Sequence, residues 1–198
     1  MTRRDLFALP PALFLAGCSS APEPPVEKKA AEPVTGLHAG FQMYSHARAW
    51  APDIKVLSCA SIDIAQVKAQ PGKCGAWQIQ FGSEALGQKR AYTFSVAEVS
   101  VTLHSGITAD APTGWSNDNR AFEMAAAKVD TDDAWTTALK HGDAYNKKNP
   151  AIPVSYTLEM GRLIHDPVWR VIWGESVASS EFSVLVDAST GLYLETLT

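Results

Sequence analysis

The sequence of 198 residues has little of several features on which common biochemical functions depend. Only 19% of its residues are charged, and no basic stripe is present. Its five histidines lack the paired HxH or HExxH spacing, so the sequence indicates neither a metal site nor a cofactor. It has no Gly-x-Ser-x-Gly elbow and no phosphate-binding glycine loop. These absences argue against a nucleic-acid partner and give no support to nucleotide or serine-hydrolase chemistry.

The N-terminal segment has the pattern of an export signal. The basic pair Arg3 and Arg4 precedes a short apolar run, which is too short to span a bilayer. Residues 15–18, Leu-Ala-Gly-Cys, resemble the bacterial lipobox, after which the cysteine is acylated and becomes the new N-terminus. We therefore predict a lipoprotein signal peptide over residues 1–17 and a membrane anchor on Cys18. The following domain is then on the extracytoplasmic side of a bacterial cell envelope.

The export route and the target membrane stay open at this point. Residues 2–7, Thr-Arg-Arg-Asp-Leu-Phe, resemble the twin-arginine motif, but paired arginines also occur in general secretory signals. Ser19 after the lipidated cysteine, in place of Asp, favours the periplasmic face of the outer membrane if the host has two membranes. The inner membrane is the alternative.

A second boundary follows from composition. Residues 18–35 are rich in Pro, Glu, Lys and Ala and contain no aromatic residue, which is typical of a disordered tether. Residues 36–198 have the size of one compact domain or two small subdomains. Removal of the signal, with two Arg and one Asp, leaves 15 basic and 20 acidic residues, a net charge of −5.

Two strand patterns, residues 77–81 and 169–173, share one plan. In both, three apolar residues share one face, Trp77, Ile79 and Phe81 in the first and Trp169, Val171 and Trp173 in the second, which indicates half-buried strands. Further β-rich segments precede and follow each of them. The flanking segments are residues 53–62, 91–96 and 99–107 in the first half, and residues 152–160, 181–186 and 192–197 in the second.

A helical pattern precedes each set of strands. Leu37, Phe41, Tyr44 and Arg48 fall one turn apart, with Thr35 as a cap. The second pattern uses Trp135, Ala138, Leu139 and Gly142, and Asp130, Thr131 or Asp132 offers its cap. We predict an α+β fold of two tandem helix-plus-antiparallel-sheet repeats, residues 36–108 and 131–198, joined by residues 109–130.

Cys59 and Cys74 are the thiols left after lipidation of Cys18. Two cysteines in an exported domain favour a disulfide. Strand parity places Cys59 on the strand face that does not carry Val56, and Cys74 on the face that does not carry Trp77. Both sulfurs are then expected to face away from the core side. We predict a Cys59–Cys74 bond, with two free thiols as the alternative.

The second repeat resembles PepSY domains. The resemblance rests on residues 167–174, Pro-Val-Trp-Arg-Val-Ile-Trp-Gly, and on a following strand that ends in Asp187, Thr190 and Gly191, the Asp-x-x-Thr-Gly pattern. It covers roughly residues 131–197; the first half has no such motif. The resemblance implies a helix packed on an antiparallel sheet, a function in binding with suggested peptidase inhibition, and no catalytic residues. From the residues themselves, Asp187 and Gly191 indicate a hairpin loop.

These observations predict a non-enzymatic envelope lipoprotein that binds a protein partner, such as a peptidase or another envelope enzyme that it regulates or inhibits. The predicted contact residues are Trp115, in a polar loop, and Gln78, Gln80 and Arg170 on the outer strand faces. Packing over the junction of the halves is the alternative for Trp115. Two rival functions are a carrier or sensor of a small apolar ligand, which predicts a large apolar pocket, and a hydrolase, which predicts a cleft with convergent titratable groups.

Overall fold

The structure is a computed structural model that describes residues 31–116, 120–162 and 164–198. Cys18, the predicted signal peptide and most of the predicted tether lie outside these residues. Within the described ranges, no helix is both long and apolar enough to cross a membrane.

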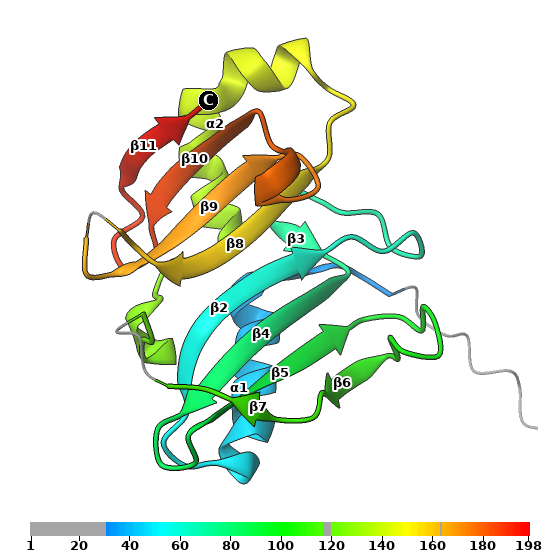
Figure 1. Cartoon of the computed structure of the whole chain (residues 1–198). Coiled ribbons are helices and arrows are strands. Elements are labelled where there is room, and N and C mark those ends of the chain that lie inside the picture. The colour runs from blue at the N-terminus through cyan, green and yellow to red at the C-terminus, as the bar shows by residue number, and fades with distance from the viewer. Residues whose placement is uncertain (1–30, 117–119, 163) are drawn as a thin grey trace, which may run out of the picture. The chain divides into compact units, whose positions relative to one another are not determined.

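One large antiparallel sheet carries two α-helices, so the predicted α+β fold class is confirmed (Figure 1). The first half comprises β1 (Val34–Thr35), α1 (Gly36–Trp50), β2 (Lys55–Ile62), β3 (Lys73–Cys74), β4 (Ala76–Ser83), β5 (Gln88–Ser95), β6 (Gly106–Ala109) and β7 (Thr113–Gly114). The second comprises the 3₁₀ helix η1 (Met124–Ala126), α2 (Thr131–Lys148), β8 (Val154–Met160), β9 (Pro167–Trp173), the 3₁₀ helix η2 (Val177–Ser179), β10 (Phe182–Asp187) and β11 (Tyr193–Leu197).

The strand order of the nine-stranded sheet is β11-β10-β9-β8-β2-β4-β5-β6, with β7 on β5. β1 and β3 form a separate pair. The two halves meet at a short seam, where Ser58, Cys59 and Ala60 of β2 pair with Glu159, Leu158 and Thr157 of β8. On each side of the seam a helix precedes a run of antiparallel strands. The predicted duplication stays a prediction, and it requires Trp77 to superpose on Trp169.

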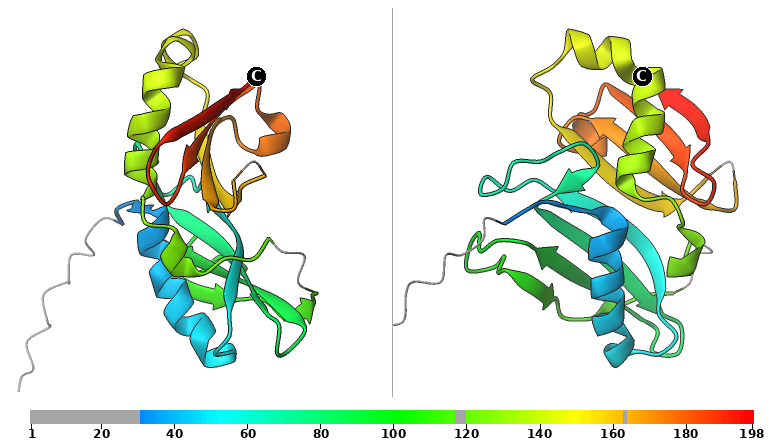
Figure 2. Two further views of the ribbon diagram at one scale, coloured as in Figure 1. Left: turned by 90° about the vertical axis from the view of Figure 1, so that its left-hand side faces the viewer. Right: turned by 180° about the vertical axis from the view of Figure 1, so that it is seen from behind.

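Both helices cover the same face of the sheet (Figure 2). α1 packs on β4 and β5, and α2 packs on β9 and β10. We call the opposite, helix-free face the outer face; Figure 1 looks onto it. The predicted strand parity is confirmed beneath the helices. The residues buried there include Trp77, Ile79 and Phe81 of β4 and Trp169, Val171 and Trp173 of β9.

The predicted contact face of α1 is wrong in part. Phe41 is 50% exposed and Arg48 is exposed, whereas Gly40, Met43 and Ala47 face the sheet. Small residues let the helix lie close to the strands: a Cβ added at Gly40 would stand 3.2 Å from Ile79 and 2.6 Å from the Met124 methyl group. Close approach of the backbone therefore determines which face is buried, in preference to the largest apolar side chains.

The cap of α1 comes from the other half of the chain. Thr35 stands at the N-cap position but makes no side-chain cap bond. The Asp130 carboxylate, which caps α2 as one of the three predicted candidates, accepts bonds from the Thr131 amide at 2.7 Å and from the Leu37 amide at 2.9 Å. One negative charge thus serves the N-termini of both helices, where the helix dipoles favour it.

Thr131 completes this junction. Its buried hydroxyl accepts a bond from the Gly36 amide at 2.9 Å and donates to the Gly72 carbonyl. The Gly72 amide in turn donates to the Tyr156 hydroxyl at 2.8 Å. These bonds join α1, α2 and β8 to the loop before β3, so the two halves share a polar core as well as a strand seam.

The β10–β11 connection is the predicted hairpin loop. The Asp187 carboxylate accepts bonds from the Ser189 amide at 2.7 Å and from the Thr190 hydroxyl at 2.6 Å, and Gly191 has a φ of 77°. Burial alone would raise the pKa of Asp187, but the bonds from Thr190 and Ser189 together lower it below its ordinary value. The PepSY-like motif is therefore satisfied internally by turn hydrogen bonds.

The predicted strand over residues 99–107 is wrong at its start. Val99 and Ser100 fold back on Leu103 in a tight turn, in which the Val99 amide donates to the Leu103 carbonyl at 3.0 Å. The strand β6 begins only at Gly106. The Ser100 hydroxyl accepts a hydrogen bond from the Leu103 amide. Such local bonds favour a turn over pairing with a neighbouring strand.

The parity argument for the cysteines is also wrong. The register of β2 against β4 shifts between Val56 and Ser58, and this bulge turns Cys59 to the same core as Val56. Both Cys59 and Cys74 are buried free thiols in the structure, so the predicted disulfide is not formed there.

Candidate functional site

The outer face is open over the first half of the sheet. Gln78 of β4 is exposed there, and its amide nitrogen donates to the Thr93 hydroxyl on β5 at 3.2 Å. Over the second half, the segment with η2 lies in front of the strands (Figure 1), and Ile172 and Ser183 are buried. A large partner therefore has access mainly to the β2, β4 and β5 part of this face.

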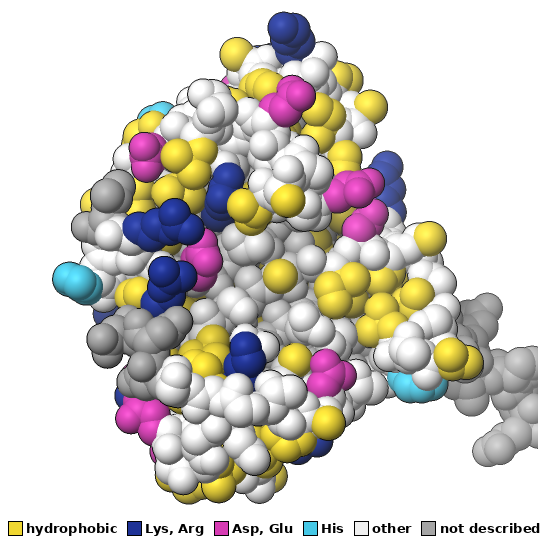
Figure 3. Space-filling model, viewed as in Figure 1, with side chains coloured by type: hydrophobic (Ala, Val, Ile, Leu, Met, Phe, Trp, Pro, Cys, Tyr) yellow, Lys and Arg dark blue, Asp and Glu magenta, His cyan; other side chains and the backbone are white. Residues whose placement is uncertain are grey.

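A groove of about 490 Å³ crosses the outer face next to the seam. We call it the basic groove. Its lining residues are Leu57, Ser58, Gln80, Lys89, Trp115, Arg120, Glu159, Met160, Gly161, Arg162 and His165. Figure 3 shows Lys and Arg side chains gathered on the left of this face, with an acidic group among them. The groove thus combines several cationic groups, planar polar groups and one indole ring.

Trp115 is held at the groove by the edge of the sheet. It follows β7, which pairs with β5, and its amide donates to the Gly87 carbonyl at 2.9 Å. Its ring lies against β4, where a Cβ added at Gly82 would stand 2.8 Å from the ring. The side chain is half-buried, so Trp115 packs on the sheet and also lines the groove.

The cationic groups and the His165 imidazole come from different segments. Lys89 lies on β5, and Arg162 and His165 lie in the β8–β9 connection, which is closed by a bond from the Gly161 amide to the Asp166 carbonyl at 3.0 Å. Glu159 is the single acidic residue of the lining. Arg162 and Glu159 are exposed, so their charges act through solvent and are sensitive to salt.

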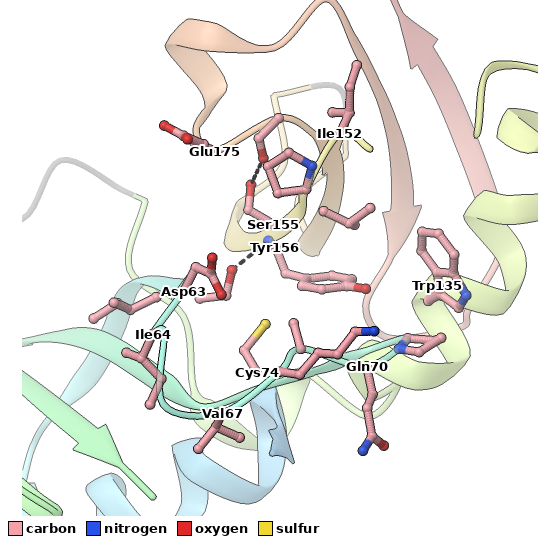
Figure 4. Close-up of a pocket in the computed structure, with 18 of the residues that line it drawn as sticks. Asp63, Ile64, Val67, Gln70, Cys74, Trp135, Ile152, Ser155, Tyr156 and Glu175 are labelled. Atoms are coloured by element: carbon pink, nitrogen blue, oxygen red, sulfur yellow. Dashed lines mark hydrogen bonds between the residues drawn. The ribbon is translucent and has the colours of Figure 1, made fainter. Parts of the chain in front are cut away.

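A second and larger hollow lies at the side of the sheet. This side cleft, of about 1000 Å³, is bounded by the loop from β2 to β3 and by the connection from α2 to β8 (Figure 4). Apolar residues from both halves line it; they include Ile64, Val67, Trp135, Ile152, Val154 and Tyr156. Polar residues also line it, among them Asp63, Lys68, Gln70, Ser155 and Glu175.

Three buried groups, Cys74 and Tyr156 in the lining of the side cleft and Cys59 in the core, are not poised for nucleophilic chemistry. Burial raises the pKa of Cys74 to about 11, although a bond with Ser61 opposes the shift, and burial raises the pKa of Cys59 further. Burial also raises the pKa of Tyr156, against a lowering by its bond from Gly72. Neither thiol is a thiolate at neutral pH.

The structure brings together two of the four predicted contact residues. Trp115 and Gln80 line the basic groove, whereas Gln78 lies beside it on β4. Arg170 is on the outer face of β9, half-buried, and its Nε donates to the Ser183 hydroxyl at 2.9 Å. Arg170 is therefore committed to an internal bond.

Sequence reasoning missed the cationic lining of the groove. Strand alternation places Lys89 and Glu159 on the outer face. The predicted strand over residues 152–160 offered a signal for Glu159, whereas Lys89 precedes the predicted strand over residues 91–96. Arg120, Arg162 and His165 lie outside the strands, where no periodicity indicates a direction. Among the described residues, no cluster of three or more potential ligands could hold a metal ion.

No family model, no curated protein and no solved structure matches this chain.

Proposed function

We propose that this chain is a non-enzymatic envelope lipoprotein that recognises a protein partner through the open part of its outer face. The observation that carries the proposal is the basic groove, where the Trp115 ring stands beside charged and planar polar side chains. Such combinations of an aromatic residue with arginine are enriched at the energetic centres of protein interfaces. Burial raises the pKa of both Cys59 and Cys74, which supports binding in preference to covalent catalysis by either thiol.

The kind of partner follows from the PepSY resemblance of residues 131–197 and from the predicted anchor. We propose a peptidase or another envelope enzyme, which the bound domain regulates or inhibits. A lipid on Cys18 would hold the domain at the membrane surface, and the tether would let the outer face reach a membrane-linked partner.

The anchor has a direct test. Cys18→Ser removes the acceptor thiol, so we expect the protein to leave the membrane fraction or to accumulate as an uncut precursor. Acylation and fractionation are measured by mass spectrometry and sedimentation, with Cys74→Ser as the matched cysteine control. Unchanged lipidation of the Cys18→Ser protein contradicts the anchor but leaves the outer-face proposal intact.

Recognition at the outer face is tested by photo-crosslinking in cells. A crosslinking residue replaces Gln78, on the outer face, or Gln42, which is exposed on α1 on the helix side. We expect one discrete crosslinked protein, identified by mass spectrometry, from position 78 and none from position 42. Equal products from both positions, or none from position 78, contradict recognition at this face.

Trp115→Ala adds a quantitative measure once the partner is identified. Loss of a central indole ring typically costs about 2 kcal/mol or more, which corresponds to roughly 30-fold weaker binding per folded molecule. Trp135→Ala, on α2, is the matched control because Trp135 is also half-buried but lines the side cleft. Equal losses for the two variants would assign the effect to stability.

The side cleft favours a second candidate function, a carrier or sensor of a small apolar ligand. Its volume of about 1000 Å³ and the apolar side chains that both halves contribute to its mixed lining support this candidate. The expected result is a lipid-like molecule that co-purifies with the mature protein and is lost from Trp135→Ala. If the bound molecule is retained by that variant and lost from Trp115→Ala, the side cleft is not its site.

A further inference from the structure

The charge of the basic groove differs from that of the rest of the chain. The mature chain carries a net charge of −5 by sequence. Lys89, Arg120 and Arg162 nevertheless line one groove, with His165 beside them and Glu159 as the only acid. In Figure 3 the same concentration of basic side chains is visible on the outer face. A local positive field on an acidic molecule attracts anionic groups to this place and away from the others.

The residues that line the groove also suit the binding of an extended peptide chain. Ser58 of β2 and Gln80 of β4 line the groove from the strands, while Trp115 and Arg162 come from segments outside the strands. Arg162 can bind a carboxylate through two parallel bonds, and Lys89 acts as a point charge. The half-buried indole of Trp115, which lines the same groove, offers an apolar contact.

We propose that the basic groove binds an acidic, extended segment of the protein partner, with carboxylates against Lys89 and Arg162 and an apolar side chain against Trp115. This inference rests on the proposed function and specifies the chemistry of the partner. Arg120 contributes to the same field, and it also interacts within the chain.

Other polyanions fit the groove less well. Nucleic-acid binding typically uses about six or more phosphate contacts, and the groove is lined by fewer cationic side chains than that. Recognition of a lipid surface typically uses clusters of about four to eight Lys or Arg residues, whereas this hollow is lined by Lys89, Arg120 and Arg162 together with Glu159. An acidic peptide strand satisfies both the concavity and the mixed lining.

The probe is a fluorescent peptide of about ten residues, long enough to cross the groove when extended, in which Glu alternates with Ser around one central Leu. The control peptide carries Gln in place of Glu. We expect the mature wild-type domain to bind the Glu peptide at least tenfold more tightly than the Gln peptide in fluorescence anisotropy. The difference should shrink as ionic strength rises, because exposed charges are screened.

The variants are Arg162→Glu and Lys89→Glu, with Lys140→Glu as the control on the exposed side of α2. Each groove variant should weaken Glu-peptide binding about tenfold or more, since like charges are placed opposite each other. Lys140→Glu changes net charge equally but should change affinity less than twofold. The double groove variant should bind a peptide with Lys in place of Glu better than the wild-type domain does, which shows that it is folded.

Three results would overturn the inference: equal affinity for the Glu and Gln peptides, an equal effect of Lys140→Glu, or binding to phosphatidylglycerol vesicles without binding to the peptide. The last result identifies a lipid surface as the anion. Crosslinking from position 78 separates this inference from the proposed function. If a partner is captured there through a neutral segment, the proposal of an acidic segment is refuted and the proposed function stands. If the peptide binds but no protein is crosslinked, the proposed partner function is refuted and the groove chemistry stands.

Discussion

Replacing Trp169 by Ala should lower the free energy of unfolding by about 4 kcal/mol, a typical loss for a large aromatic side chain removed from a core. Trp169 is completely buried, and its indole N–H donates to the Val129 carbonyl at 2.7 Å. Its ring meets the Trp77 ring edge-on at a centroid distance of 6.4 Å. The substitution removes this packing between the halves and also leaves the partly buried Val129 carbonyl without this donor.

Urea unfolding followed by circular dichroism measures this loss. The control is Trp115→Ala, because Trp115 is half-buried and lies on the outer face. We expect the control to lose much less stability, since solvent already reaches part of its ring. Equal losses for the two variants would show that the contact between Trp77 and Trp169 contributes little to stability.

Thr131→Val should cost about 3 kcal/mol, although the two side chains have nearly the same shape. The hydroxyl that it removes serves the Gly36 amide and the Gly72 carbonyl, and Thr131 is completely buried. Each buried polar group left without a partner costs about 1–3 kcal/mol.

Thr131→Ser is the matched control because it keeps the hydroxyl and loses one methyl group, which is worth about 1 kcal/mol. A larger loss for Ser than for Val in urea unfolding would mean that methyl packing at Gly36 outweighs the hydrogen bonds. Hydrogen exchange adds a second readout, since the Gly36 amide should lose protection in the Val variant alone.

The fold class could be predicted because alternation along β4 and β9 is strong. Trp77 and Trp169 recur in patterns that place both rings on one face of the sheet, and residue spacing indicates the two helices. Local errors arose where backbone geometry overrides side-chain pattern. The bulge after Val56 reversed the direction of Cys59, and Gly40 allowed α1 to turn its small face to the sheet.

The candidate site was predictable only in part. Gln80 was found from parity, and Trp115 was found as an unusual residue in a polar loop. That Trp115 and Arg162 line one groove depends on how the two halves, which contribute one residue each, come together at the seam. A single sequence has no periodic pattern from which this arrangement can be predicted, because neither residue lies within a strand.

The short seam between β2 and β8 has a consequence for how the chain folds. Each sheet half pairs its own neighbouring strands, but the seam joins residues near 58 to residues near 159. Closing so long a loop is entropically costly, so the seam should form late, after both halves have their strands. Until then, β2 and β8 each present an open edge. At high concentration, β2 of one molecule can meet β8 of another, and two chains that exchange halves in this way would form a swapped dimer with the same pairing as the monomer.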